Sequence, residues 1–219
     1  PIRPELENAL GLYLSEFDVR IAFKPTDFTQ VNHALNETMV SRAVRLLRLT
    51  PESRVVDFFC GLGNFTLPLA RRSARVSRAK AGAAENGLAD KTDFVARNLF
   101  TWSEQDWDAI WKKMGGIDRL LLDPPREGAQ AVCQVLAATD KRPERVVYVS
   151  CNPATLARDC AILQHQGGWR LLEAGVMNMF PHTGHVESMA VLVPGPKPIP
   201  SEKAEDKAES GDSRPAEAA

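Results

Sequence analysis

The sequence predicts an α/β fold with a mostly parallel, doubly wound sheet. From residue 54 onward, short apolar runs rich in β-branched residues alternate with longer runs that have helical spacing. The 219 residues are 44% hydrophobic, which is enough for one sizeable core. With 27 Lys and Arg against 28 Asp and Glu, the formal charge is −1. Binding of nucleic acid by bulk charge is therefore excluded, but binding through a local basic face is not.

Each element follows from a local pattern. Apolar and polar residues alternate over residues 17–23, which indicates a half-buried strand. Asn36 is expected to cap a helix over residues 37–49 that ends before Pro51. The later strands are expected over residues 54–59, 92–96, 117–122, 145–150, 169–177 and 187–193, and the later helices over 64–72, 77–86, 102–113, 127–138 and 153–166. The loop between the last two strands is too short for a crossover helix, so these strands should be antiparallel.

The chain is expected to have three parts. Residues 1–35 lead in from an upstream domain, residues 36–193 form the main domain, and residues 194–219, which are rich in proline and polar residues, form a disordered tail. The first residue is Pro1 rather than Met, which suggests a piece of a longer protein. No run approaches the roughly 20 apolar residues of a membrane span, and we expect a cytoplasmic monomer with no membrane partner.

Cys151 is the cysteine best placed for chemistry. It follows the predicted strand 145–150, and Asn152 and Pro153 are typical of the cap and first position of a helix. The positive end of that helix dipole favours a thiolate. Cys60 lies in a glycine turn, and Cys133 and Cys160 fall within predicted helices, where core packing is the simpler interpretation. The four cysteines have no metal-ligand spacing.

Three other motifs follow predicted strands or precede one. The glycine turn at 60–65 either lets the backbone approach a ligand or is only a tight turn. Two prolines hold Asp123 at the carboxyl end of a strand, where it either contacts a ligand or ends the strand stiffly. His182, His185 and Glu187 lack the spacing of a known metal motif. A general-base role for Glu187 fits better, with the histidines positioning substrate or packing.

Together these motifs resemble the RNA uracil-5 methyltransferase family. The resemblance rests on DFTQVN at 27–32, DFFCGLGNFTLPLA at 57–70, LLDPPREGA at 121–129, YVSCNPATLARD at 148–159 and MFPHTGHVES at 179–188. It is closest to the branch that methylates uracil in 23S ribosomal RNA. The resemblance implies a class I, Rossmann-like methyltransferase fold, a ribosomal RNA substrate and S-adenosylmethionine as methyl donor.

The resemblance also assigns roles to individual residues. Cys151 would add to C6 of uracil, and Glu187 would remove the C5 proton. The cofactor pocket would be lined by Gln30, Phe59, Asn64, Asn98 and Asp123. The iron–sulfur cluster of the family has no ligands among these cysteines, and no metal is expected in this chain.

One segment departs from the family pattern. An acid at the end of the second strand should bind the ribose of the cofactor, but the chain runs from Val76 directly into a helical pattern. About a strand's worth of chain is missing between Val76 and Ser77, either by a real deletion or by omission of residues. The alternatives are a catalytically silent fragment that still contacts RNA, and methylation of cytosine instead of uracil.

Overall fold

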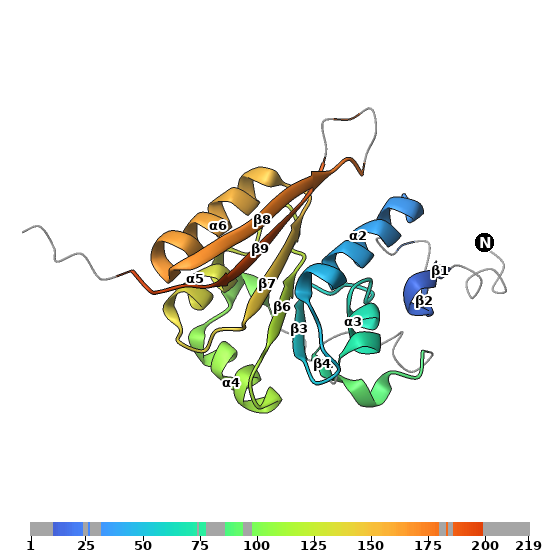
Figure 1. The fold of residues 1–219 in the computed structure, drawn as a ribbon, viewed down its shortest axis with the longest axis horizontal. Helices are drawn as coiled ribbons and strands as arrows, with labels where there is room; N and C mark the ends of the chain where they lie inside the picture. The colour runs from blue at the N-terminus through green and yellow to red at the C-terminus, as the bar shows by residue number, and fades with distance from the viewer. Residues whose placement is uncertain are drawn as a thin grey trace, which may run out of the picture.

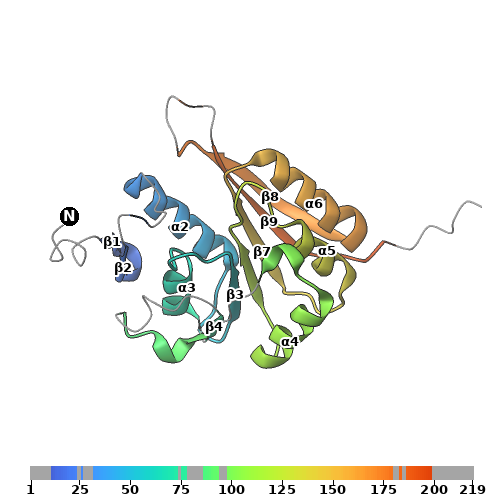
Figure 2. The same ribbon diagram turned by 180° about the vertical axis from the view of Figure 1, so that it is seen from behind.

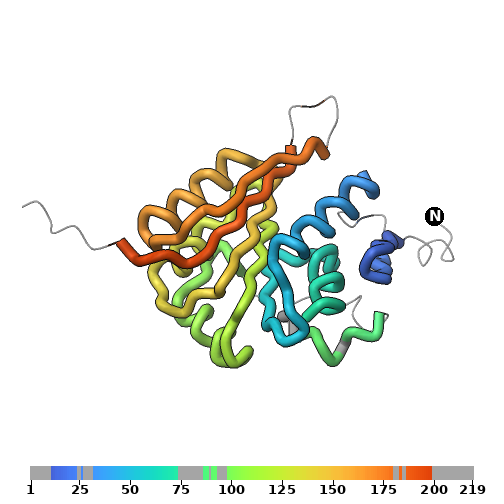
Figure 3. Tube along the Cα trace, in the orientation of Figure 1, coloured from blue at the N-terminus to red at the C-terminus, as the bar shows by residue number. Residues whose placement is uncertain are grey.

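The computed structural model describes residues 11–23, 26, 32–73, 75–77, 86–93, 98–179, 183 and 186–198. Their centre is a seven-stranded sheet with the order β5-β4-β3-β6-β7-β9-β8, seen nearly edge-on in Figure 1. The first five strands are parallel, and β9 runs antiparallel between β7 and β8. The predicted doubly wound α/β sheet is confirmed, including the antiparallel final pair, whose path Figure 3 traces.

The bounds of the elements are as follows. The strands of the sheet are β3 (Arg54–Phe58), β4 (Arg75–Ser77), β5 (Thr92–Asp93), β6 (Arg119–Leu122), β7 (Arg145–Ser150), β8 (Trp169–Met177) and β9 (Glu187–Pro194). The α-helices are α2 (His33–Leu47), α3 (Thr66–Arg72), α4 (Glu104–Met114), α5 (Gln130–Ala138) and α6 (Pro153–Gly167). Before them stand β1 (Gly11–Leu14), the 3-10 turn η1 (Ser15–Phe17) and β2 (Val19–Ala22); η2 (Ala89–Lys91) and η3 (Leu99–Thr101) are further 3-10 turns.

Two apolar clusters lie on the two faces of the sheet. Because side chains alternate along a strand, Val55 joins the cluster under α2 and α3, whereas Val56 joins the cluster under α4, α5 and α6. Figures 1 and 2 show these two helix layers from opposite sides. The β1–β2 hairpin contributes Leu14 and Ile21 to the α2 side. The sheet, with the loops at its strand ends, is thus packed between two layers of helices.

The first strand and first helix differ from the prediction. Residues 17–23 do not form one strand, because Phe17 ends η1 and only Val19–Ala22 pair with β1. Helix α2 begins four residues earlier than predicted, and its cap is Asn32, whose side chain accepts from the Leu35 amide at 3.2 Å. Asn36 was the wrong cap because its buried amide pairs with another side chain inside the fold.

The second strand is present and short, as the strand's worth of chain missing there from the sequence predicts. Strand β4 pairs in parallel with β3, with Val76 opposite Val55 and Ser77 opposite Val56. It stops there, whereas β3 continues for two more residues to Phe58. The end of β4 is therefore recessed by roughly 7 Å from that of β3. The predicted helix over 77–86 is wrong at its ends, which lie in β4 and a turn, and residues 78–85 lie outside the described part.

The start of the predicted tail is ordered. Strand β9 continues to Pro194, and Lys197 donates to the Ala138 carbonyl at 2.7 Å and pairs with Asp140 at 2.7 Å. Residues 199–219 lie outside the described part of the chain. No helix in the described residues has the length and apolar character needed to cross a membrane.

Candidate active site

Cys151 and Glu187 are cross-strand neighbours. Strands β7 and β9 pair antiparallel up to Ser150 opposite Ser188, and Cys151 and Glu187 are the residues next to this last pair. The Ser188 hydroxyl donates to the Ser150 carbonyl at 2.9 Å and supports this register. The charge of Glu187 acts on the Cys151 thiol, whose pKa it raises. The two residues that the sequence assigned to catalysis are therefore brought together by one strand pair.

The helix after Cys151 forms as predicted. The Asn152 side chain accepts from the Ala154 amide at 3.1 Å, and Pro153 occupies the first turn of α6. Cys151 is half-buried at this helix N-terminus. Burial nevertheless raises the pKa of its thiol, the charge of Glu187 raises it further, and Arg126 lowers it. The predicted preference for a thiolate is thus outweighed in the free protein.

Two carboxyl groups, those of Glu187 and Asp123, raise the pKa of the Cys151 thiol by their charge. Burial raises the pKa of Glu187 to about 7. Asp123 lies just beyond β6, where burial first, and then the charges of Asp57 and Glu187, raise its pKa well above the ordinary value. Since one ionised carboxylate disfavours another close by, this site holds protons near neutral pH. A carboxyl group with a pKa near 7 suits acid–base work.

A polar latch joins the Cys151 loop to the loop after β6. The Asn152 side chain and the Thr155 hydroxyl both donate to the Arg126 carbonyl, each at 3.1 Å. Arg126 follows Pro124 and Pro125 in the loop that begins with Asp123. The latch therefore ties the loop that carries Asp123 to the start of α6, next to Cys151. Arg126 was not singled out from the sequence, because its influence on the thiol depends on this tertiary contact.

A buried hydrogen-bond network also joins α6 to the loop after β6. The Asp159 carboxylate of α6 accepts from the Tyr148 hydroxyl at 2.6 Å and from the Ala129 amide at 2.7 Å. A Cβ atom on Gly128 would lie 2.6 Å from Asp159, and its φ of +80° is one that favours glycine. This close approach requires the glycine.

The glycine turn carries the predicted cofactor residues Phe59 and Asn64. Phe59 has φ of +64°, followed by Gly61 at +50° and Gly63 at +96°, so the backbone turns sharply after β3. The Phe59 ring packs edge-on against Phe100, with centroids 5.9 Å apart. Phe100 is 54% exposed. The sequence prediction missed it, although an aromatic residue after a strand's carboxyl end was a usable signal.

The other predicted site residues lie in different surroundings. Asn64 and Asn36 exchange two amide hydrogen bonds, at 2.8 and 2.9 Å, which tie the glycine turn to α2. Asn98 is exposed and caps η3 by accepting from the Phe100 amide at 3.0 Å. Gln30, His182 and His185 lie outside the described residues. No group of three or more potential metal ligands occurs in the part of the chain that is described.

The sequence profile of tRNA (Uracil-5-)-methyltransferases matches residues 11–92 and 109–194, which is most of the chain. The chain belongs to this family. It is 54% identical over 205 residues to the 23S rRNA (uracil(1939)-C(5))-methyltransferase RlmD of Bordetella bronchiseptica, covering 88% of this chain and 43% of the relative. The RlmD of Cupriavidus pinatubonensis is 52% identical over 202 residues, covering 85% and 43%. The chain spans less than half the length of these curated relatives.

Solved structures agree with the family and the fold. The Pyrococcus abyssi tRNA (uracil-54, C5)-methyltransferase, solved with S-adenosyl-L-homocysteine, matches with a TM-score of 0.65 and 28% identity over 84% of this chain and 44% of that one. A SAM-dependent O-methyltransferase of Thermotoga maritima matches with a TM-score of 0.55 and 16% identity, over 78% and 69% of the two chains. The class I methyltransferase fold is confirmed.

Proposed function

We propose that this chain is the catalytic domain of a 23S ribosomal RNA uracil-C5 methyltransferase that works through a covalent bond to Cys151. The observation that carries the proposal is that Cys151 and Glu187 adjoin the last pair of the β7–β9 register, Ser150 and Ser188, where the charge of Glu187 acts on the thiol. The RlmD relatives, at 52–54% identity, support ribosomal RNA as the substrate.

The chemistry needs a nucleophile and a base on one pyrimidine ring. The deprotonated sulfur of Cys151 forms a bond to C6, and the C5–C6 electron pair moves onto the C4 carbonyl oxygen as an enolate. S-adenosylmethionine, when bound, supplies the methyl group that C5 accepts. Glu187 then removes the C5 proton, the C5–C6 double bond forms again, and the C6–sulfur bond breaks. The raised pKa makes the Glu187 carboxylate a stronger base than an ordinary glutamate, and at about 7 it is still low enough for the proton to be lost to water near neutral pH.

The residues present fit this cofactor in part. The glycine turn leaves room for close backbone approach, the Phe59–Phe100 pair offers aromatic surface at the same edge, and Asp123 lies beyond the neighbouring strand. Asn64, Asn98 and Gln30 are further proposed contacts. The ribose acid is the misfit, since residues 77–84 contain no Asp or Glu.

The test uses a version of the protein in which the missing strand's worth of chain after Val76 is restored, incubated with S-adenosylmethionine and in vitro transcribed 23S ribosomal RNA that contains 5-fluorouridine. Fluorine at C5 cannot leave as a proton, so a covalent complex should accumulate on a denaturing gel and map by peptide mass to Cys151. Cys151→Ala should abolish the complex, whereas the matched variant Cys60→Ala should keep it. Mapping to another cysteine, or turnover by Cys151→Ala, would refute the assignment.

Glu187→Gln separates the base from the nucleophile. With ordinary uracil RNA this variant should form the covalent complex but release it slowly, because only proton removal is impaired. Fast release equal to that of the wild type would remove Glu187 from the mechanism. A complex with 5-fluorocytidine RNA alone would favour the cytosine alternative.

A silent, RNA-contacting fragment is the second candidate, and the recessed β4 favours it. This candidate predicts that the chain binds 23S ribosomal RNA in a filter assay but forms no covalent complex in the presence of S-adenosylmethionine.

A further inference from the structure

A pocket of about 460 Å³ lies at the sheet edge opposite the candidate active site. Its lining includes Pro51, Ser73 and Lys91, which precede the amino ends of β3, β4 and β5. Cys151 instead follows the carboxyl end of β7, a parallel strand of the same sheet. The five residues of β3 span roughly 17 Å, which sets the order of the separation between the two sites.

The pocket is strongly cationic although the whole chain is not. One carboxylate, that of Glu16, faces five cations in the lining: Arg45, Arg48, Arg71, Arg72 and Lys91. The formal charge of the full chain is −1. Glu16 is itself engaged by the Ser41 hydroxyl and by Arg45 at 3.8 Å. The net positive charge of this pocket is therefore a local concentration.

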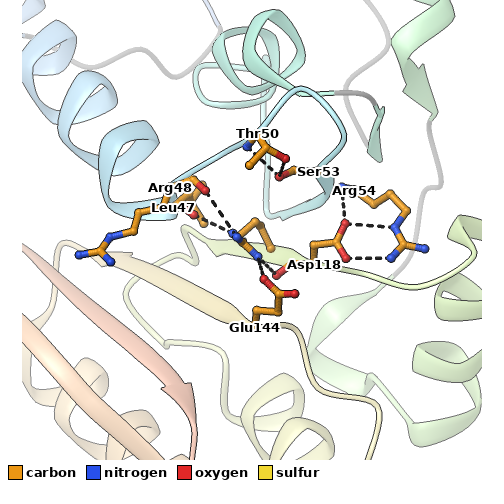
Figure 4. A network of polar contacts seen from close by, with 8 residues as sticks. Leu47, Arg48, Thr50, Ser53, Arg54, Asp118 and Glu144 are labelled. Atoms are coloured by element: carbon orange, nitrogen blue, oxygen red, sulfur yellow. Dashed lines mark hydrogen bonds and ion pairs between the residues drawn. The ribbon is translucent and has the colours of Figure 1, made fainter.

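Two of the cations are held in place and two have no counter-ion. Arg71 donates to the Asp18 carbonyl at 2.9 Å, and Arg72 lies over the Phe17 ring at 5.6 Å, so the β1–β2 hairpin orders both. Arg48 and Lys91 form no ion pair within the described residues. Figure 4 shows the Arg48 side chain pointing away from the ion pairs around Asp118 and Glu144, to which it contributes only its carbonyl.

The pKa of the neighbouring Arg145 is also affected by this excess of positive charge. Burial lowers the pKa of Arg145 at the start of β7, and the charges of Arg48 and Arg119 lower it further. An anion bound near Arg48 would relieve this repulsion.

We propose that this pocket binds backbone phosphates of the ribosomal RNA substrate, roughly five nucleotides of helical strand from the methylated base; the inference rests on the proposed function. The distance follows from roughly 17 Å across the sheet and about 3.4 Å for each nucleotide of a helical strand. Arginine guanidinium groups match phosphate geometry. The residues that line the pocket include no aromatic ring on which the base of a free nucleotide could stack, which favours an RNA backbone.

The test is filter binding of unmodified 23S ribosomal RNA transcript to the full chain between 50 and 200 mM salt. The double variant Arg48→Gln/Lys91→Gln should bind more weakly, and its slope of log affinity against log salt should fall by about 0.7 to 0.9 for each lost phosphate contact. Arg48→Lys should keep the wild-type slope. The matched control is Lys112→Gln on exposed α4, which should also keep it. Residue 48 has a φ of +51°. Glutamine and lysine, like arginine, are unbranched at Cβ, so the substitutions leave the backbone strain at this position unchanged.

The outcomes separate the inference from the proposed function. A slope unchanged in the folded double variant, checked by circular dichroism, overturns the inference, while the 5-fluorouridine complex at Cys151 can still form. The inference would also be overturned if the pocket bound inorganic phosphate at 10 mM and constant ionic strength but did not respond to RNA. The pocket would then be a site for free phosphate. Absence of RNA binding by the wild type contradicts both proposals.

Discussion

Glu187 links the chemistry of the site to the stability of the fold. Its side chain is 4% exposed, and burial raises its pKa from 4.5 to about 7. The folded chain therefore binds this proton more tightly than the unfolded chain does. The resulting contribution to stability is fully present below about pH 4.5 and is lost as the pH rises through 7.

We predict that Glu187→Gln stabilises the protein at pH 8 much more than at pH 5, with a difference of about 2 kcal/mol in the free energy of unfolding. The neutral amide avoids the buried charge, and it also lowers the repulsion on Asp123. Urea unfolding at both pH values measures the effect, with Glu52→Gln in the exposed turn before β3 as control. An equal change at both pH values would show that the carboxyl group titrates normally.

Single residues were predictable where the signal is local in sequence. The cap at Asn152, with Pro153 after it, depends on neighbours one to three positions away, and it is confirmed. Asn36 was misjudged because its partner, Asn64, lies 28 positions away. Arg126 and Phe100 were missed for the same reason, since their relation to Cys151 and Phe59 arises from packing.

At the scale of elements, the loop after β6 and the start of α6 behave as one unit. The Arg126 carbonyl, the Ala129 amide and the Asp159 carboxylate join them, and a Cβ on Gly128 would meet the side chains of Thr155, Arg158 and Asp159 of α6. A side chain at this glycine would separate the loops that carry Asp123 and Cys151.

We predict that Gly128→Ala lowers the free energy of unfolding by about 1 to 3 kcal/mol, because alanine combines an unfavourable φ with contacts of 2.6 Å to Arg158 and Asp159. Gly175→Ala is the matched control, since nothing lies within 4 Å of a Cβ at that exposed position of β8. Thermal unfolding compares the two variants. A Gly128→Ala protein as stable as Gly175→Ala would mean that the loops separate without cost.

Strand prediction succeeded where burial and length were ordinary. The apolar run of β7 and the nine residues of β8 have the predicted bounds, because each has a clear turn signal at both ends. The bounds of strand β4 were not predicted, because three residues are too few to show a periodicity. Its pairing to β3 is supplied by the sheet, and not by its own sequence.

At the scale of the whole molecule, the two sheet edges have different characters. The carboxyl edge carries buried carboxyl groups around Cys151, while the amino edge carries the cationic pocket. The family motifs predicted the functional residues at the carboxyl edge. The amino edge could not be predicted, because its arginines come from α2 and α3 and gather only when the helices pack.

The recessed β4 gives the last prediction. Because Ser77 lies two residues short of the end of β3 and no acid follows it before Glu85, the ribose hydroxyls of the cofactor have no carboxylate partner at that position. We expect S-adenosylmethionine to bind weakly or not at all to this chain in calorimetry. Inserting, between Val76 and Ser77, a strand-length segment that ends in a glutamate should extend β4 and restore micromolar binding.

Asp123→Ala in the extended protein is the control for the location of the site, and it should weaken the restored binding. Micromolar binding by the unextended chain, with intact mass confirming its sequence, would show that other groups hold the ribose. Failure of both proteins to bind would instead favour the silent, RNA-contacting chain, because the extension would then not be what the site lacks.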